Sequence, residues 1–312
     1  MPSGPSTMTV LASVAGTSAI TIVKFVAAGF SGSAAMLAEG VHSSVDTINS
    51  LLLYLGLRRS QKPADETHPF GYGLELYFWT LVVALLMFAV GGGLTIAEGI
   101  YHVLQPEELG SVGWSYTVLG LCMAFNGFTW AVAVKQFWVS KGNQGFWQAV
   151  RKAKDPTILT VLFEDSASLV GLVIAFLGIF LTRFFDLPAL DGIASILIGV
   201  LLGGVAIGLV YQSKTLLAGE SANEETVQSI RKLVQSDNAV EKIENLLTMH
   251  LSPEEILLNL KIRFRDGLPI RAVGEAVDRL EERLRAEHPE LKRIFIEPGP
   301  LTAADANGAE WR

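Results

Sequence analysis

The sequence predicts an α-helical membrane protein, a bundle of six transmembrane helices followed by a small cytoplasmic α+β domain. Half of its 312 residues are hydrophobic and only 18% are charged, which is unlike a soluble globular domain. The charges are also uneven, since residues 213–312 hold 14 of the 24 Lys and Arg and 18 of the 31 Asp and Glu. We therefore expect a membrane domain over 1–212, an α+β domain over 213–300 and a disordered tail over 301–312.

Six apolar runs define the expected membrane helices. Each is close to or above the ~20 residues that a helix needs to cross the hydrocarbon core. They cover about 8–29, 34–57, 75–103, 112–137, 157–182 and 192–211. Small residues recur in them, as in SGSAAM, AVGGGLT and LLGGVAIG. These residues allow close helix packing in lipid, although they could also mark hinges.

The basic residues of the connecting segments predict the orientation. The second connection contains Arg58, Arg59 and Lys62, and the fourth contains Lys135, Lys141, Arg151, Lys152 and Lys154. The first and third connections contain no Lys or Arg, and the fifth contains only Arg183. By the positive-inside rule, both termini face the cytoplasm. We expect a multi-pass protein of the cell membrane, or of the inner membrane if the cell is Gram-negative.

The last hundred residues show the pattern of a small α+β domain. Apolar residues recur at helical spacing in 223–236, and two strand-like stretches follow, VEKIENLLTMH and EEILLNLKIRF. An amphipathic segment, IRAVGEAVDRLEERLRAEHPE, predicts a helix that stops before Pro289, and KRIFIEP predicts a last strand. The expected order is α-β-β-α-β.

Composition excludes several classes of partner and site. The net charge of −7 argues against nucleic-acid binding and against a polybasic lipid anchor. The single cysteine, Cys122, excludes an internal disulfide and a CxxC motif. The first ten residues, MPSGPSTMTV, contain no Lys or Arg and no cleavage pattern, which argues against a secretory or transit peptide.

The second apolar run, unusually, contains three ionisable residues. His42 and Asp46 are four residues apart, and Glu39 precedes His42 by three, so all three share one helix face. Ionisable groups inside a membrane line a pathway or pair with each other. Imidazole and carboxylate at this spacing can both bind one divalent ion. The alternative is a His–Asp hydrogen bond that only stabilises helix packing.

The fifth run contains adjacent carboxylates, Glu164 and Asp165. Neighbours on a helix point about 100° apart, so we expect one to face the second run and the other to support it. We favour Asp165, because the small Ser166 and Ala167 after it allow close approach. Glu164 would then accept from Lys154 or from a helix end. The opposite register, with Glu164 on the site face, stays open.

Other polar residues have two interpretations in some cases and one in others. In the loop DETHPFGYG, Asp65 and His68 form a candidate second metal site or belong to a tight turn rich in Pro and Gly. Lys24 in the first run pairs with a carboxylate or extends to the interface. Asp191 reads as the N-terminal cap of the sixth run. His250, next to SPEE, reads as a surface histidine.

These features together resemble the cation diffusion facilitator family. They are six spans with both termini inside, His42-x-x-x-Asp46, carboxylates in the fifth span, PADETHPFGYG and a small α+β tail domain. HPFGYGLELYFW and DPTILTVLFEDSASLVG resemble the branch that includes the animal mitochondrial zinc transporter. The resemblance covers nearly the whole chain.

The resemblance implies a homodimer that exchanges a cytoplasmic divalent cation, usually Zn²⁺, for protons, with no permanently bound cofactor. It also implies two ligands in the second span, at His42 and Asp46, and two more in an [HD]-x-x-x-D pattern in the fifth. The chain departs from that pattern, because Thr160 and Val161 precede Glu164 and Asp165 by four residues. Glu39 is our candidate for the missing fourth ligand.

Two further departures concern the loop and the tail domain. Tyr72 replaces a histidine that would complete the second site with Asp65 and His68. The His-rich sites of some relatives' tail domains are reduced here to His250, which argues against a zinc sensor in this domain.

We expect the chain to be a secondary transporter, not an enzyme. An imidazole ligand suits Zn²⁺ better than Mg²⁺ or Ca²⁺, and with an ordinary pKa of about 6.5 it can exchange metal for a proton. Fe²⁺, Mn²⁺, Co²⁺ and Cd²⁺ are alternative substrates. A membrane metal sensor without transport is a second hypothesis. An intramembrane metalloenzyme is a third, but HExxH is absent.

Overall fold

The computed structural model describes residues 7–106, 112–141, 145 and 156–299. The chain divides into two compact units. The first consists of Met1–Gln61 and Glu75–Lys214, and the second of Lys62–Leu74 and Thr215–Arg312. The tail over 301–312 and the basic residues Arg151, Lys152 and Lys154 lie outside the described residues.

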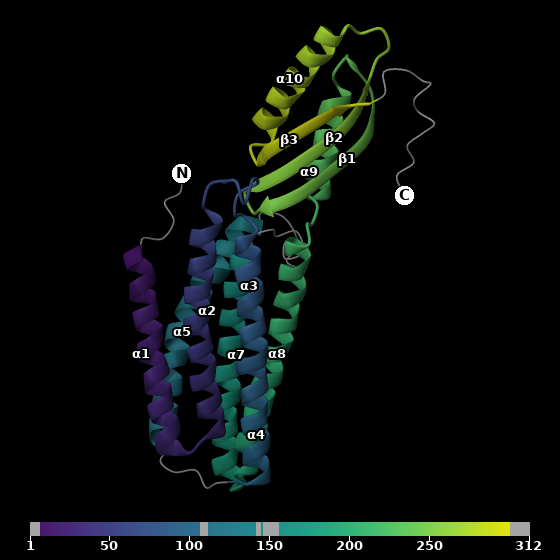
Figure 1. Cartoon of the computed structure of the whole chain (residues 1–312). Helices are drawn as coiled ribbons and strands as arrows, with labels where there is room; N and C mark the ends of the chain where they lie inside the picture. The colour runs from purple at the N-terminus through teal and green to yellow at the C-terminus, as the bar shows by residue number, and fades with distance from the viewer. Residues whose placement is uncertain (1–6, 107–111, 142–144, 146–155, 300–312) are drawn as a thin grey trace. The chain divides into compact units, whose positions relative to one another are not determined.

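The first unit is built from long helices, and each predicted apolar run falls in one helical segment (Figure 1). These are α1 (Thr7–Ser31), α2 (Ala34–Ser60), α3 (Glu75–Leu86) with η1 (Met87–Leu94) and α4 (Thr95–Leu104), α5 (Val112–Lys141), α7 (Pro156–Phe185) and α8 (Ala189–Leu217). Within the described part of the chain, three segments are long and apolar enough to cross a membrane: Glu75–Leu104, Leu162–Phe185 and Ala189–Leu217. The protein therefore has a helical transmembrane domain.

Large apolar side chains are exposed on the outside of this unit. Phe30, Leu121 and Phe128 are 67%, 67% and 71% exposed. In water such surfaces would be unfavourable, whereas lipid chains solvate them well. Inside the bundle the packing depends on small residues. A Cβ added at Gly99 would lie 2.8 Å from the carbonyl oxygen of Gly192 on α8, so α4 and α8 approach closely because both positions lack a side chain.

A side chain of another helix, α8, forms hydrogen bonds with the first residues of α2. The chain turns at Gly32, whose φ is 65°, a value that favours glycine. Ser33 then caps α2 by accepting a hydrogen bond from the Met36 amide. The Asp191 carboxylate accepts bonds from the Ser33 hydroxyl (2.7 Å) and the Ala35 amide (3.2 Å). The prediction that Asp191 caps its own helix is therefore wrong, since it lies inside the first turn of α8 and caps α2.

The second unit contains a three-stranded sheet in the predicted element order. The elements are α9 (Glu224–Gln235), β1 (Val240–Ser252), β2 (Glu255–Phe264), α10 (Ile270–Glu287) and β3 (Leu291–Pro298). β2 is central, antiparallel to β1 and parallel to β3. The alternating Leu258, Leu260 and Ile262 of β2 point into a core shared with α9 and α10, as their period of two requires.

The two helices of this unit also contact each other, α9 packing on β1 and α10 on β3. They therefore cover the same face of the sheet. His250 in β1 is only 4% exposed, so the prediction of a surface histidine is wrong. Its position in the strand, not its polar neighbours, decides its burial.

Candidate metal site

One face of α2 carries a row of four polar residues. Glu39, His42, Asp46 and Asn49 follow each other at intervals of three, four and three residues, so they lie in one row along the helix. Glu39, His42 and Asn49 have no exposed surface. The row faces inward, whereas the apolar Ile48 and Leu51 of the same helix are 49% and 43% exposed.

His42 and Asp46 lie next to each other in this row. The His42 Nδ1 is 3.3 Å from the Asp46 Oδ1, and the Asp46 side chain is 24% exposed. Among the described residues, neither ring nitrogen of His42 has a hydrogen-bond partner, and neither does the Asp46 Oδ1. A buried polar atom without a partner costs about 1–3 kcal/mol. These atoms are thus available to a cation or to protons.

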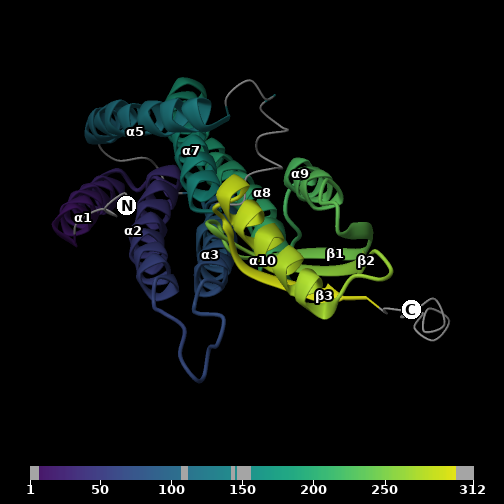
Figure 2. The same ribbon diagram turned by 90° about the horizontal axis from the view of Figure 1, so that it is seen from above.

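α7 brings Glu164 to the Asn49 end of the row. Helices α2 and α7 are neighbours (Figures 1 and 2). The Asn49 Nδ2 donates to the Glu164 Oε1 at 2.7 Å. The carboxyls of Asp46 and Glu164 also lie within hydrogen-bonding reach of each other. Two ionised carboxylates have no proton to share, so this contact needs either a proton or a cation between them.

The register of α7 is the opposite of the one we favoured. Glu164 is nearly buried and faces α2, whereas Asp165 is partly exposed and points about 100° away around the helix. Ser166, which we expected to allow close approach to α2, accepts from the Trp130 indole instead. The pairing of Glu164 with Lys154 concerns a residue outside the described part of the chain. The geometry favours Glu164 over Asp165 as the residue that meets His42 and Asp46.

Glu39 has a cationic partner from α1. The Lys24 Nζ lies 3.0 Å from the Glu39 Oε2 and donates to the Ser43 hydroxyl at 2.7 Å. The side chains of Lys24 and Glu39 are both 0% exposed. Of the two readings for Lys24, the structure shows the pairing with a carboxylate. Glu39 shares the face of His42, but its charge is already compensated.

The polar residues do not close around one point in this conformation. Within the described ranges, no three side chains of His, Cys, Asp or Glu lie together closely enough to hold one metal ion. His42 and Asp46 form one pair, and Asp46 and Glu164 form another. Asp46 belongs to both pairs, and the set of one nitrogen and two carboxylates suits Zn²⁺.

Asp65 and His68 lie in the second unit, in the loop Lys62–Leu74. Asp65 accepts from the Tyr72 hydroxyl (2.7 Å), the Thr67 hydroxyl (2.8 Å) and the His68 amide (2.8 Å). These hydrogen bonds, that of Tyr72 above all, hold the pKa of Asp65 well below its usual range. The His68 ring stacks on Tyr72 with centroids 4.1 Å apart. The structure thus shows the turn, in which Tyr72 donates to one carboxylate oxygen of Asp65.

Sequence reasoning missed Asn49. Its signal was present, because it continues the row of α2 three residues after Asp46. An amide was easily read as a packing residue. Only the neighbouring helix shows that it orients Glu164.

Two family models match the chain. The model described as "Cation efflux transmembrane domain" covers residues 10–218. The model described as "Cation efflux protein, cytoplasmic domain" covers residues 222–300.

Several curated proteins are similar over most of the chain. The mitochondrial proton-coupled zinc antiporter SLC30A9 of Homo sapiens is 30% identical over 92% of this chain, and that of Xenopus laevis is 29% identical over 88%. The chain spans only 51% and 56% of these two antiporters, about half their length. The cation-efflux pump FieF of Klebsiella pneumoniae is 26% identical, covering 89% of this chain and 88% of the pump.

Proposed function

We propose, from the premise that the chain belongs to the cation efflux family of cation diffusion facilitators, that it exports a divalent cation from the cytoplasm in exchange for protons. Zn²⁺ is the proposed substrate. The observation that carries the proposal is the row of buried polar side chains on α2, where the two ring nitrogens of His42 and the Oδ1 of Asp46 have no hydrogen-bond partner among the described residues. The relatives support it, since two are named proton-coupled zinc antiporters and a third an efflux pump.

We assign the ligands to His42 and Asp46 of α2 and Glu164 of α7. Asn49 orients Glu164 through its amide. Asp165 supports Glu164 from the next position, and we leave Glu39 outside the ligand set because Lys24 holds it. No resident cofactor is part of the proposal, because the metal is the cargo.

Proton exchange follows from the same three groups. A metal bound between them takes the place of protons, because ligands must be deprotonated to bind it. When the metal leaves, Asp46 and Glu164 can share a proton in the contact that the structure shows. An imidazole takes up another readily near neutral pH. Each cycle therefore returns protons to the site that released the metal.

We also propose the finer topology. The chain crosses the cell membrane six times, α3, η1 and α4 forming one span, with both termini in the cytoplasm. The distribution of Lys and Arg supports this. Single cysteines introduced into each connecting loop of a Cys122→Ser protein would test it, because only extracytoplasmic thiols react with an impermeant reagent in intact cells.

We also propose a separate role for each domain. Residues 1–212 carry transport, residues 213–300 form a dimerisation module, and 301–312 are a tail. The apolar core of the small domain and its family match support a folded module that pairs two copies. Light scattering of the purified protein tests the homodimer.

The test of function is a metal panel on purified protein in proteoliposomes with an imposed pH gradient. We expect Zn²⁺ uptake that follows the gradient and moves protons in return. Faster transport of Fe²⁺, Mn²⁺, Co²⁺ or Cd²⁺ would change the substrate and leave the mechanism intact. Metal binding without flux would instead indicate a membrane metal sensor.

A further inference from the structure

Lys24 is an uncommon residue for its position. Its side chain is 0% exposed in the interior of a helical membrane unit, where a charge is costly. It has two partners on α2, Glu39 at 3.0 Å and Ser43 at 2.7 Å. Lys24 also acts electrostatically on His42 and Asp46, so a positive charge stands beside the proposed metal site.

Glu39 is held on two sides. Its Oε2 contacts Lys24, and its Oε1 lies against the backbone of α7 at Gly171, where an added Cβ would be only 2.7 Å away. The Oε1 has no hydrogen-bond partner among the described residues. This carboxylate is therefore chemically able to bind a cation, but Lys24 and the narrow space at Gly171 fix its position.

We propose that Lys24 is a built-in counter-cation that keeps Glu39 from acting as a metal ligand and thereby limits the affinity of the site. The inference rests on the proposed function in taking His42, Asp46 and Glu164 as the metal site. A third carboxylate would bind Zn²⁺ more tightly and slow its release. By neutralising Glu39, Lys24 keeps the site weak enough to empty in each cycle.

The proposal predicts that two single substitutions change the affinity for Zn²⁺ in opposite directions. Lys24→Met removes the positive charge and frees Glu39, so we expect Zn²⁺ to bind about five to ten times more tightly. Glu39→Gln leaves Lys24 without its counter-charge, and the uncompensated ammonium should weaken binding by a similar factor. In the double variant, uncharged Met and Gln replace the ion pair of Lys24 and Glu39, so the net charge beside the site does not change. Its Kd for Zn²⁺ should therefore be close to that of the wild-type protein.

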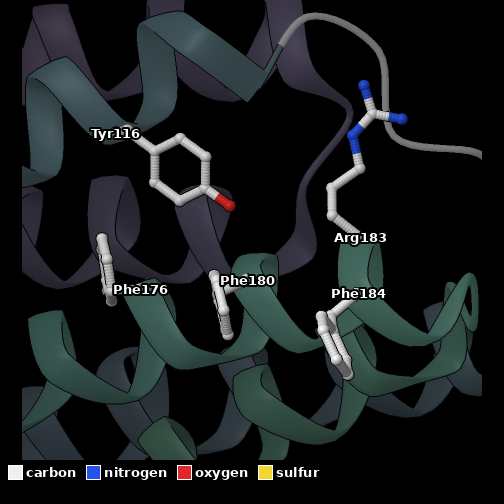
Figure 3. Close-up of a pocket in the computed structure, with 5 residues that line it drawn as sticks. All are labelled: Tyr116, Phe176, Phe180, Arg183 and Phe184. Carbon is white, nitrogen blue, oxygen red and sulfur yellow. The ribbon is translucent and has the colours of Figure 1, made fainter.

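Arg183 provides the matched control. It is a positive charge of the same unit and lines a pocket with Tyr116, Phe176, Phe180 and Phe184 (Figure 3). It follows Glu164 on α7 by 19 residues, about 28 Å along a helix. Arg183→Gln should leave the Kd unchanged.

The measurement is Zn²⁺ titration calorimetry on the full-length variants in detergent, with transport rates in proteoliposomes beside it. Lys24→Met should show lower KM and lower maximal rate, a split that general misfolding does not produce. If Lys24→Met does not fold, Glu39→Gln and the double variant still decide the matter. The proposal is overturned if the double variant binds as weakly as Glu39→Gln, because Glu39 would then be a ligand.

Other outcomes have distinct meanings. Unchanged Kd values in the folded fraction of both single variants would show an ion pair that only stabilises the fold, and would overturn the inference. Zinc binding without flux in the wild-type protein would overturn the proposed function alone. The Kd values of the variants would still show how Lys24 affects the affinity for zinc. If the wild-type protein bound no metal of the panel, both proposals would be overturned.

Discussion

Buried polar side chains differ between the two units of the chain in how completely their atoms are hydrogen-bonded. In the second unit, the Asp237 side chain is 3% exposed. It accepts two hydrogen bonds from Arg279, at 2.8 and 2.9 Å, and one from the Ala239 amide at 3.0 Å. In the first unit, the inward face of α2 has acceptor atoms without partners on Glu39, His42, Asp46 and Asn49, as far as the chain is described.

The difference distinguishes charged residues that stabilise the fold from charged residues that bind a ligand. A carboxylate with its acceptor positions filled, like Asp237, recovers much of the free energy lost on leaving water. A row of unpaired buried acceptors is a net cost to folding, and such groups persist where something binds to them. We infer that the satisfied cluster stabilises its domain and the unsatisfied one serves transport.

The largest effect should come from Asp46→Ala. It removes the carboxylate that contacts both His42 and Glu164, so we expect Zn²⁺-coupled proton flux to fall more than about 100-fold. Folding should not suffer, because a partly unsatisfied buried charge has been removed. Zinc uptake and internal pH in vesicles at matched expression measure this. Ser44→Ala, which loses only a hydrogen bond to the Gly40 carbonyl on α2, is the control. Full activity of Asp46→Ala would remove the basis of the transport-site assignment.

The next effect compares the two carboxylates of α7. Glu164→Ala should abolish transport almost as fully as Asp46→Ala, because it deletes both the ligand and the partner of Asn49. Asp165→Ala should cost less, within the about 10–100-fold that is typical of a residue acting behind a ligand. Rates of both variants in the same vesicle assay decide the order. A greater loss in Asp165→Ala would restore the register that we favoured from the sequence.

A change of selectivity should follow from His42→Asp. A hard oxygen ligand replaces a borderline nitrogen, which lowers the preference for Zn²⁺ over Mn²⁺ and other divalent cations. We expect transport to continue, with the ratio of Zn²⁺ to Mn²⁺ rates reduced about tenfold. A metal panel on the variant measures the ratio. If the relative rates stay as in the wild-type protein, His42 does not touch the metal.

The smallest effect on transport belongs to Asp237→Ala. Its hydrogen bonds from Arg279 lower the pKa of Asp237, so its contribution to stability is complete above the unfolded value of about 3.9 and disappears as pH falls through the lower folded value. At pH 7 we expect the small domain to lose about 1–3 kcal/mol, while transport per folded molecule is unchanged.

Hydrogen exchange by mass spectrometry on the full chain reports the local stability of residues 222–298. The difference between wild type and Asp237→Ala should be constant from about pH 7 to 5 and shrink below about pH 4. The exposed Asp278 of α10 supplies the control variant, Asp278→Ala. A difference that grew on acidification would contradict the assignment.

Local patterns in the sequence were sufficient for much of the fold. The apolar runs predicted the long helical segments, and the alternation in 255–264 predicted β2. The spacing of Glu39, His42 and Asp46 predicted one helix face. Each of these features depends on the geometry of a single helix or strand, and a period of 3.6 or 2 residues is written directly into the chain.

Contacts between helices were decided only by the tertiary structure. The sequence could not choose between Glu164 and Asp165, because the rotation of α7 about its axis depends on how both helices pack. It could not show that Lys24 pairs with Glu39, or that Asp191 caps α2 across 158 residues of chain. Partners of buried charges are set by the relative placement of whole helices, and no local periodicity encodes that placement.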